Sequence, residues 1–89
     1  MYIVIDHDIR NAATFQQRAE KAFPLPEGLP VHMFLPAADM SRATCLYEAD
    51  SVDRVRSFVD PLLGDSAKNT YVPIAAEHAM GLPGRQAVR

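Results

Sequence analysis

The clearest candidates for chemistry are His32 and Glu48, which we expect on neighbouring strands of one hairpin. A carboxylate beside an imidazole orients the ring and favours its protonated form, so such a pair can transfer protons. We therefore name His32 as the candidate acid/base and Glu48 as the residue that orients it. The alternative is structural, with His32 hydrogen-bonded at a strand end and Glu48 a solvated acid ahead of a helix.

Other reactive residue types form weaker patterns. Asp6, His7 and Asp8 resemble a cluster of metal ligands, but neighbours in a strand point to opposite faces, and a polar strand end explains them as well. Cys45 has no nearby sequence partner and fits a buried small apolar residue better than a nucleophile. The sequence contains no glycine-rich phosphate loop, zinc-ligand spacing or serine elbow. We accordingly predict no metal site and no cofactor.

Hydrophobic periodicity and turn residues define the elements that must position these side chains. A helix follows Asn11, which is a candidate N-cap, and a second helix follows Asp50 or Ser51. Pro61 should break the second helix. The predicted strands cover residues 2–6, 31–35, 43–49 and 70–76.

The resulting order, β-α-β-β-α-β, is that of a ferredoxin-like α+β fold, with a four-stranded antiparallel sheet and both helices on one face. At 89 residues the chain is one domain, which we place at residues 1–80, followed by a flexible tail at 81–89. The first and fourth strands are apolar on both sides, so something apolar should cover the second face of the sheet. The simplest cover is an identical sheet, giving a homodimer of the dimeric α/β-barrel type with a space between the sheets. An open aromatic face on a monomer is the alternative.

Strand parity then sorts the side chains between the two faces. If the second and third strands close near Leu35 and Ala43, facing residues have numbers that sum to about 78 and share a face. This places Cys45 under the helices and the candidate site on the other face, where it is an apolar pocket with a few polar groups. Besides His32 and Glu48, the predicted ligand-binding residues there are Tyr2, Asp6, Phe34 and Tyr71.

The run Thr44-Cys45-Leu46-Tyr47-Glu48-Ala49, followed by a helix with Val55-Arg56, resembles part of a known superfamily. It is similar to the third strand and second helix of small ferredoxin-like families of the dimeric α/β-barrel superfamily, including a domain-of-unknown-function family with a nickel-binding member. The resemblance implies a dimer with a central cavity. Because that superfamily includes cofactor-free monooxygenases, isomerases, haem enzymes, ligand sensors and metal binders, it does not select one activity.

Composition excludes several classes of function. A net charge of -2 gives no basic surface for nucleic acid, and no apolar stretch approaches the roughly 20 residues that span a membrane. The chain begins with Met1-Tyr2-Ile3-Val4-Ile5 and without a basic, cleavable leader, which predicts a cytoplasmic protein.

Two hypotheses of function follow. The first is a homodimer that binds a small apolar or aromatic ligand, with isomerase or cofactor-independent monooxygenase chemistry as its candidate reactions. The second is a non-catalytic module that binds a metal of the nickel type or another protein, with a dry dimer interface. The sequence leaves open whether the protein is an enzyme.

Overall fold

The computed structural model describes residues 1–83 and contains the predicted order of helices and strands. The elements are β1 (Tyr2–Ile9), α1 (Ala12–Glu20), β2 (Val31–Pro36), β3 (Arg42–Glu48), α2 (Val52–Leu63) and β4 (Ala67–Pro73). Two short 3-10 helices, η1 (Gly64–Ser66) and η2 (Ala76–His78), precede and follow β4.

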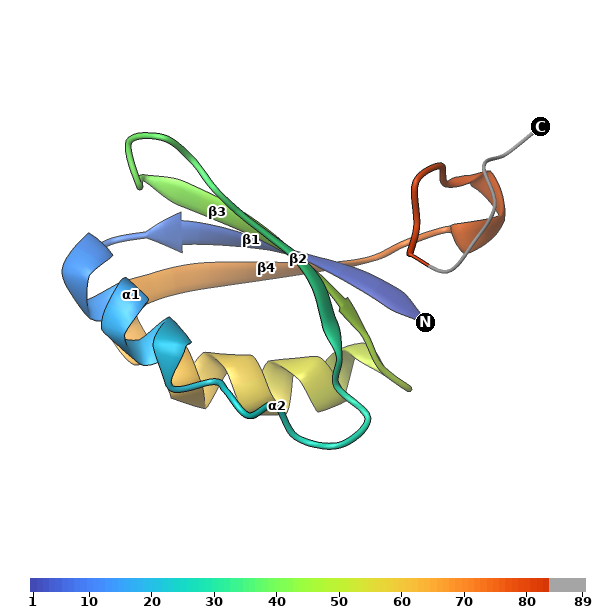
Figure 1. Cartoon of the computed structure of the whole chain (residues 1–89), viewed down its shortest axis with the longest axis horizontal. Coiled ribbons are helices and arrows are strands. Elements are labelled where there is room, and N and C mark those ends of the chain that lie inside the picture. The colour runs from blue at the N-terminus through green and yellow to red at the C-terminus, as the bar shows by residue number, and fades with distance from the viewer. Residues whose placement is uncertain (84–89) are drawn as a thin grey trace.

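The four strands form one sheet in the order β2-β3-β1-β4, and every neighbouring pair is antiparallel. Helices α1 and α2 both lie on one side of this sheet (Figure 1). The predicted ferredoxin-like α+β fold is therefore confirmed. We call the sheet face under the helices the helix face and the opposite one the open face.

The starts of both helices follow from local sequence. The side chains of Asn11 and Ser51 accept hydrogen bonds from the backbone N–H groups of Thr14 and Arg54, as N-caps do. The predicted break at Pro61 is wrong, because α2 continues through Pro61 to Leu63. Packing holds this last turn, since Leu63 is buried in the core and its carbonyl accepts a hydrogen bond from Arg18.

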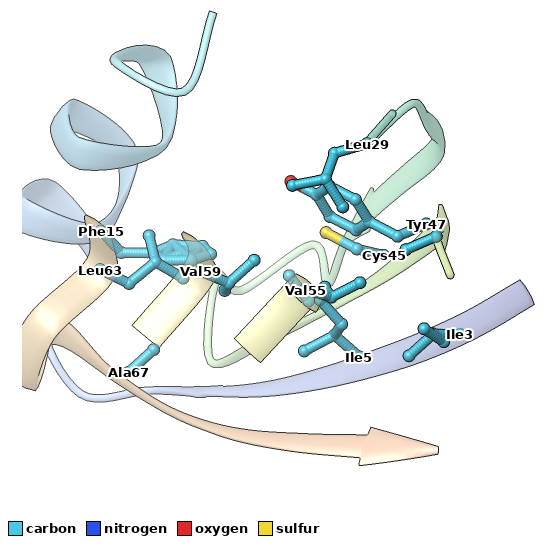
Figure 2. Close-up of a cluster of buried hydrophobic side chains, with 12 residues drawn as sticks. Ile3, Ile5, Phe15, Leu29, Cys45, Tyr47, Val55, Val59, Leu63 and Ala67 are labelled. Carbon is cyan, nitrogen blue, oxygen red and sulfur yellow. The ribbon is translucent and has the colours of Figure 1, made fainter. Parts of the chain in front are cut away.

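The core lies between the helix face and α2. Ile3 and Ile5 of β1 are fully buried, as are Phe15 of α1 and Val55 of α2. Figure 2 shows Ile5 and Val55 pointing toward each other between strand and helix. Tyr47 and Cys45 extend from β3 into the same cluster, so the predicted position of Cys45 under the helices is confirmed.

The hairpin of β2 and β3 departs from the predicted register at one residue. Val31 pairs with Tyr47 as predicted, but the register shifts before Met33, so that Met33 pairs with Leu46 and Phe34 with Cys45. His32 is the inserted residue of this bulge, and an insertion moves all following side chains to the opposite face. Phe34 is therefore on the helix face, whereas the prediction placed it on the open face.

Of the tail that we predicted at residues 81–89, residues 84–89 lie outside the described part of the structure. Neither of the α-helices in residues 1–83 has the length and hydropathy needed to cross a bilayer.

Candidate functional site

The structure brings three predicted site residues together on the open face. Nε2 of His32 lies 2.9 Å from Oε1 of Glu48, within hydrogen-bond distance. Tyr2 pairs with Glu48 across β1 and β3, and its ring centroid lies 5.8 Å from that of His32. The side chains of His32 and Glu48 are 23% and 43% exposed, so this pair is accessible to a small molecule or to a second protein surface.

The other three predicted ligand-binding residues do not join this group. Asp6 is on the open face but lies farther along β1, where Thr44 donates a hydrogen bond of 3.3 Å to it. Tyr71 pairs with Ile5, so it is on the helix face, and its hydroxyl donates to Asp60 of α2 at 2.6 Å. The predicted open-face position of Tyr71 is therefore wrong, as it is for Phe34.

A pocket lies on the helix side of the sheet, where sequence reasoning did not place a site. Its volume is about 440 Å³, within the range of roughly 300–1,000 Å³ that is typical of small-molecule sites. Helices α1 and α2 supply walls on one side, and β2 and β3 supply the other. Most of the lining residues are apolar: Phe15, Ala19, Ala22, Phe23, Phe34, Pro36, Met40, Val59, Leu62 and Leu63, with His7, Gln16, Glu20, Cys45 and Tyr47 as the others.

His7, like Cys45 and Tyr47, is a buried titratable residue on the wall of this pocket. It is 2% exposed, and its ring centroid lies 5.3 Å from that of Phe15. Its Nε2 lies 3.1 Å from Sγ of Cys45, and its Nδ1 lies 2.6 Å from Oδ1 of Asn69. The amide nitrogen of Asn69 in turn donates to Asp60 at 2.9 Å. His7 is thus held from both ring nitrogens, as an oriented acid/base or ligand-binding group would be.

Burial sets the protonation states around the pocket. Desolvation lowers the pKa of His7, although the hydrogen bond to Asn69 and the charges of Asp6 and Asp60 oppose it. Desolvation also raises the pKa of Cys45 to about 12. The thiol and the imidazole are therefore both neutral at pH 7, because each charged form would lose its hydration in this apolar region.

One sequence signal could have located His7. Our prediction ended the first strand at Asp6, but the strand continues to Ile9. Ile3, Ile5, His7 and Ile9 then share the helix face by their alternation, and a buried histidine among three isoleucines follows. The position of Asn69 opposite His7 depends on the pairing of β1 with β4, which the sequence does not reveal.

The open face carries a continuous apolar row. Met33, Leu46, Val4 and Val72 are consecutive partners across all four strands. Of these side chains, Met33 and Val72 are 38% and 41% exposed, and Leu35 beside the row is 59% exposed. Helices α1 and α2 lie on the other side of the sheet (Figure 1).

The chain is a ferredoxin-like α+β domain with an apolar pocket on the helix side of its sheet. Comparisons with protein-family models, curated proteins and solved structures gave no match to this chain. Within residues 1–83, no three His, Cys, Asp or Glu side chains converge to hold a metal ion.

Proposed function

We propose that this protein binds a small apolar molecule in the pocket between helix α1 and the sheet. The observation that carries the proposal is the pocket itself, about 440 Å³ in volume and lined mostly by apolar side chains. A hollow of this size that is lined by Phe15 and Phe34 and has His7 on its wall has the composition of a ligand site.

Filling the pocket tests this proposal. Ala19 lines the pocket from α1, so Ala19→Phe should occupy it and weaken the binding of ethylbenzene at least tenfold. Ala13→Phe is the matched control, because Ala13 is exposed on the same helix and does not line the pocket. Binding is measured from amide chemical shifts in an NMR titration. Shifts that avoid the pocket residues, or equal affinities of the two variants, would contradict the proposal.

We also propose that the protein is a homodimer that pairs through its open faces. The apolar row of Met33, Leu46, Val4 and Val72 supports this, because a two-fold axis in the plane of the interface lets the row pack on its own copy. Small domains bury only about 60–65% of their unfolded surface, so covering a second apolar face stabilises them further. This assembly is that of a dimeric α/β barrel.

Sedimentation at micromolar concentration tests the dimer. The wild-type protein should sediment with about twice the mass of one chain, and Leu35→Glu should sediment as a monomer, because it places a charge beside the apolar row. Phe23→Glu is the control, since Phe23 is equally exposed but follows α1 on the helix side. A monomeric wild-type protein, or dissociation by both variants, would refute the open-face dimer.

A second candidate function rests on the 2.9 Å contact of His32 with Glu48. In the dimer, this pair and Tyr2 line the space between the sheets and supply the acid/base of a cofactor-independent isomerase or monooxygenase. Neutral His32 accepts a proton from a carbon atom of the bound molecule, and the protonated ring then donates a proton back to that molecule. Glu48 stabilises the intervening imidazolium.

Hydrogen–deuterium exchange of phenylacetone tests this candidate function. If His32 acts as the base, the wild-type protein should accelerate deuterium uptake at the carbon between the ring and the carbonyl, and His32→Gln should remove this acceleration. His78→Gln is the control, because His78 is exposed in η2. Equal rates for the two variants, or no acceleration over buffer, would refute it.

A further inference from the structure

We infer that the ligand of the helix-side pocket is an apolar molecule with one hydrogen-bond donor, such as an alcohol or a phenol, which donates to Nε2 of His7. This inference rests on the proposed function, and it names the chemistry that the pocket selects. The hydrogen-bond donors and acceptors around His7 determine this preference.

The carboxylate of Asp60 accepts hydrogen bonds from two side chains. The hydroxyl of Tyr71 donates to it at 2.6 Å. The Asn69 atom that lies 2.9 Å from the same carboxylate oxygen must therefore be the amide nitrogen, which donates. The orientation of the Asn69 amide is fixed by this contact, and its oxygen is left to face His7.

The Asn69 oxygen then fixes the tautomer of His7. Because Oδ1 of Asn69 can only accept, Nδ1 of His7, at 2.6 Å, must carry the proton. His7 is neutral, since burial disfavours its charged form, so its Nε2 has a lone pair and no hydrogen. Nε2 of His7, a residue that lines the pocket, is therefore a hydrogen-bond acceptor, and its ring is held by hydrogen bonds that run from Asp60 of α2 through Asn69 of β4.

In the described structure Nε2 of His7 has one partner, the thiol of Cys45 at 3.1 Å. A thiol is a weak donor, and a hydroxyl in the pocket would form a stronger bond to the same lone pair. Tyr47 also lines the pocket, and its hydroxyl can both donate and accept, so it does not discriminate. His7 is thus the group that distinguishes a ligand with a donor from one without.

Two isomeric probes separate these possibilities. p-Cresol has a hydroxyl donor, whereas anisole has the same atoms but only an acceptor oxygen. NMR titrations give the ratio of the dissociation constants of the two probes. Comparing that ratio between protein variants cancels the difference in hydration between p-cresol and anisole. We expect the ratio to favour p-cresol roughly threefold to tenfold more in the wild-type protein than in His7→Phe, as expected for one net hydrogen bond.

Cys45→Ala provides a second variant with the opposite expected effect. Removing the thiol leaves Nε2 of His7 without a donor, so the preference for p-cresol should increase relative to wild type. An unchanged ratio in Cys45→Ala would overturn the inference even if His7→Phe did not fold. A preference for anisole that is lost in His7→Phe would also overturn it, because Nε2 would then carry the proton.

The outcomes distinguish this inference from the function on which it rests. If neither probe shifts the amides of the pocket residues, the proposed pocket function fails. If both probes bind in the pocket with the same ratio in wild type, His7→Phe and Cys45→Ala, only the inference about the donor fails. A ¹⁵N spectrum of the His7 ring tests the premise directly, because Nδ1 should carry the proton and Nε2 should not.

Discussion

Acidification should destabilise this protein through His7 well before its carboxylates are protonated. His7 is 2% exposed, and burial lowers its pKa below that of an unfolded histidine. The hydrogen bond to Asn69 and the charges of Asp6 and Asp60 act in the opposite direction but do not outweigh desolvation. The folded state therefore holds a neutral ring at a pH where the unfolded chain binds a proton.

The sign and size of the effect follow from proton linkage. A histidine in the unfolded chain titrates near about 6.5, so below that pH the unfolded state binds more protons and is favoured. The contribution of His7 to stability is complete above about pH 6.5 and is lost as the pH falls toward its folded-state pKa. For a ring that stays neutral in the folded state, the loss between about pH 7.5 and 5.5 is at most about 1.4 kcal/mol.

Urea unfolding of the wild-type protein and His7→Phe at these two pH values measures this effect. His32, His78 and all the carboxylates are present in both proteins, so the difference between their two pH responses isolates His7. We expect the free energy of unfolding to fall by up to about 1.4 kcal/mol more in wild type than in His7→Phe. Equal responses of the two proteins, or a larger loss of stability in His7→Phe than in wild type, would refute the burial argument.

Further predictions concern the core and the buried thiol. Phe15→Ala should lower the free energy of unfolding by about 3–5 kcal/mol, because Phe15 is buried. Phe23→Ala should lower it by less than about 0.5 kcal/mol, because Phe23 is 63% exposed. Similar values for the two variants in urea unfolding would contradict the described core. In the same assay, Asn69→Ala should lower the free energy of unfolding by about 1–3 kcal/mol, because it leaves Nδ1 of His7 buried without an acceptor. A decrease below about 0.5 kcal/mol would argue against that hydrogen bond. A charged aromatic disulfide reagent should label Cys45 slowly in the native protein and rapidly in urea, because burial raises the pKa of the thiol to about 12. Rapid labelling of the native protein would show that the thiol is accessible.

Local sequence determined the order of the elements and much of their packing. A strand is indicated by side chains that alternate with a period of two residues, and a helix by apolar residues three and four positions apart. Both patterns are properties of short segments, so they predicted four strands and two helices in the observed order. Asn11 marked the first helix start, and Asp50 or Ser51, of which Ser51 is the cap, marked the second, because a cap acts on the next turn of its own chain. The proximity of His32 and Glu48 was also predictable, because hairpin parity relates residues on consecutive strands.

Contacts between distant segments decided the rest. A bulge at His32 moved Phe34 to the helix face, and no local pattern distinguishes a bulged strand from a regular one. Tyr71 faces α2 because β4 pairs with β1 in a register that places it opposite Ile5. The pocket forms between the two helices and the sheet, and the contacts of His7 with Cys45 and Asn69 arise because β1 pairs with both β3 and β4. Sheet pairing brings ring atoms of His7 within 3.1 Å of Cys45 and Asn69, which lie 38 and 62 positions away in the chain.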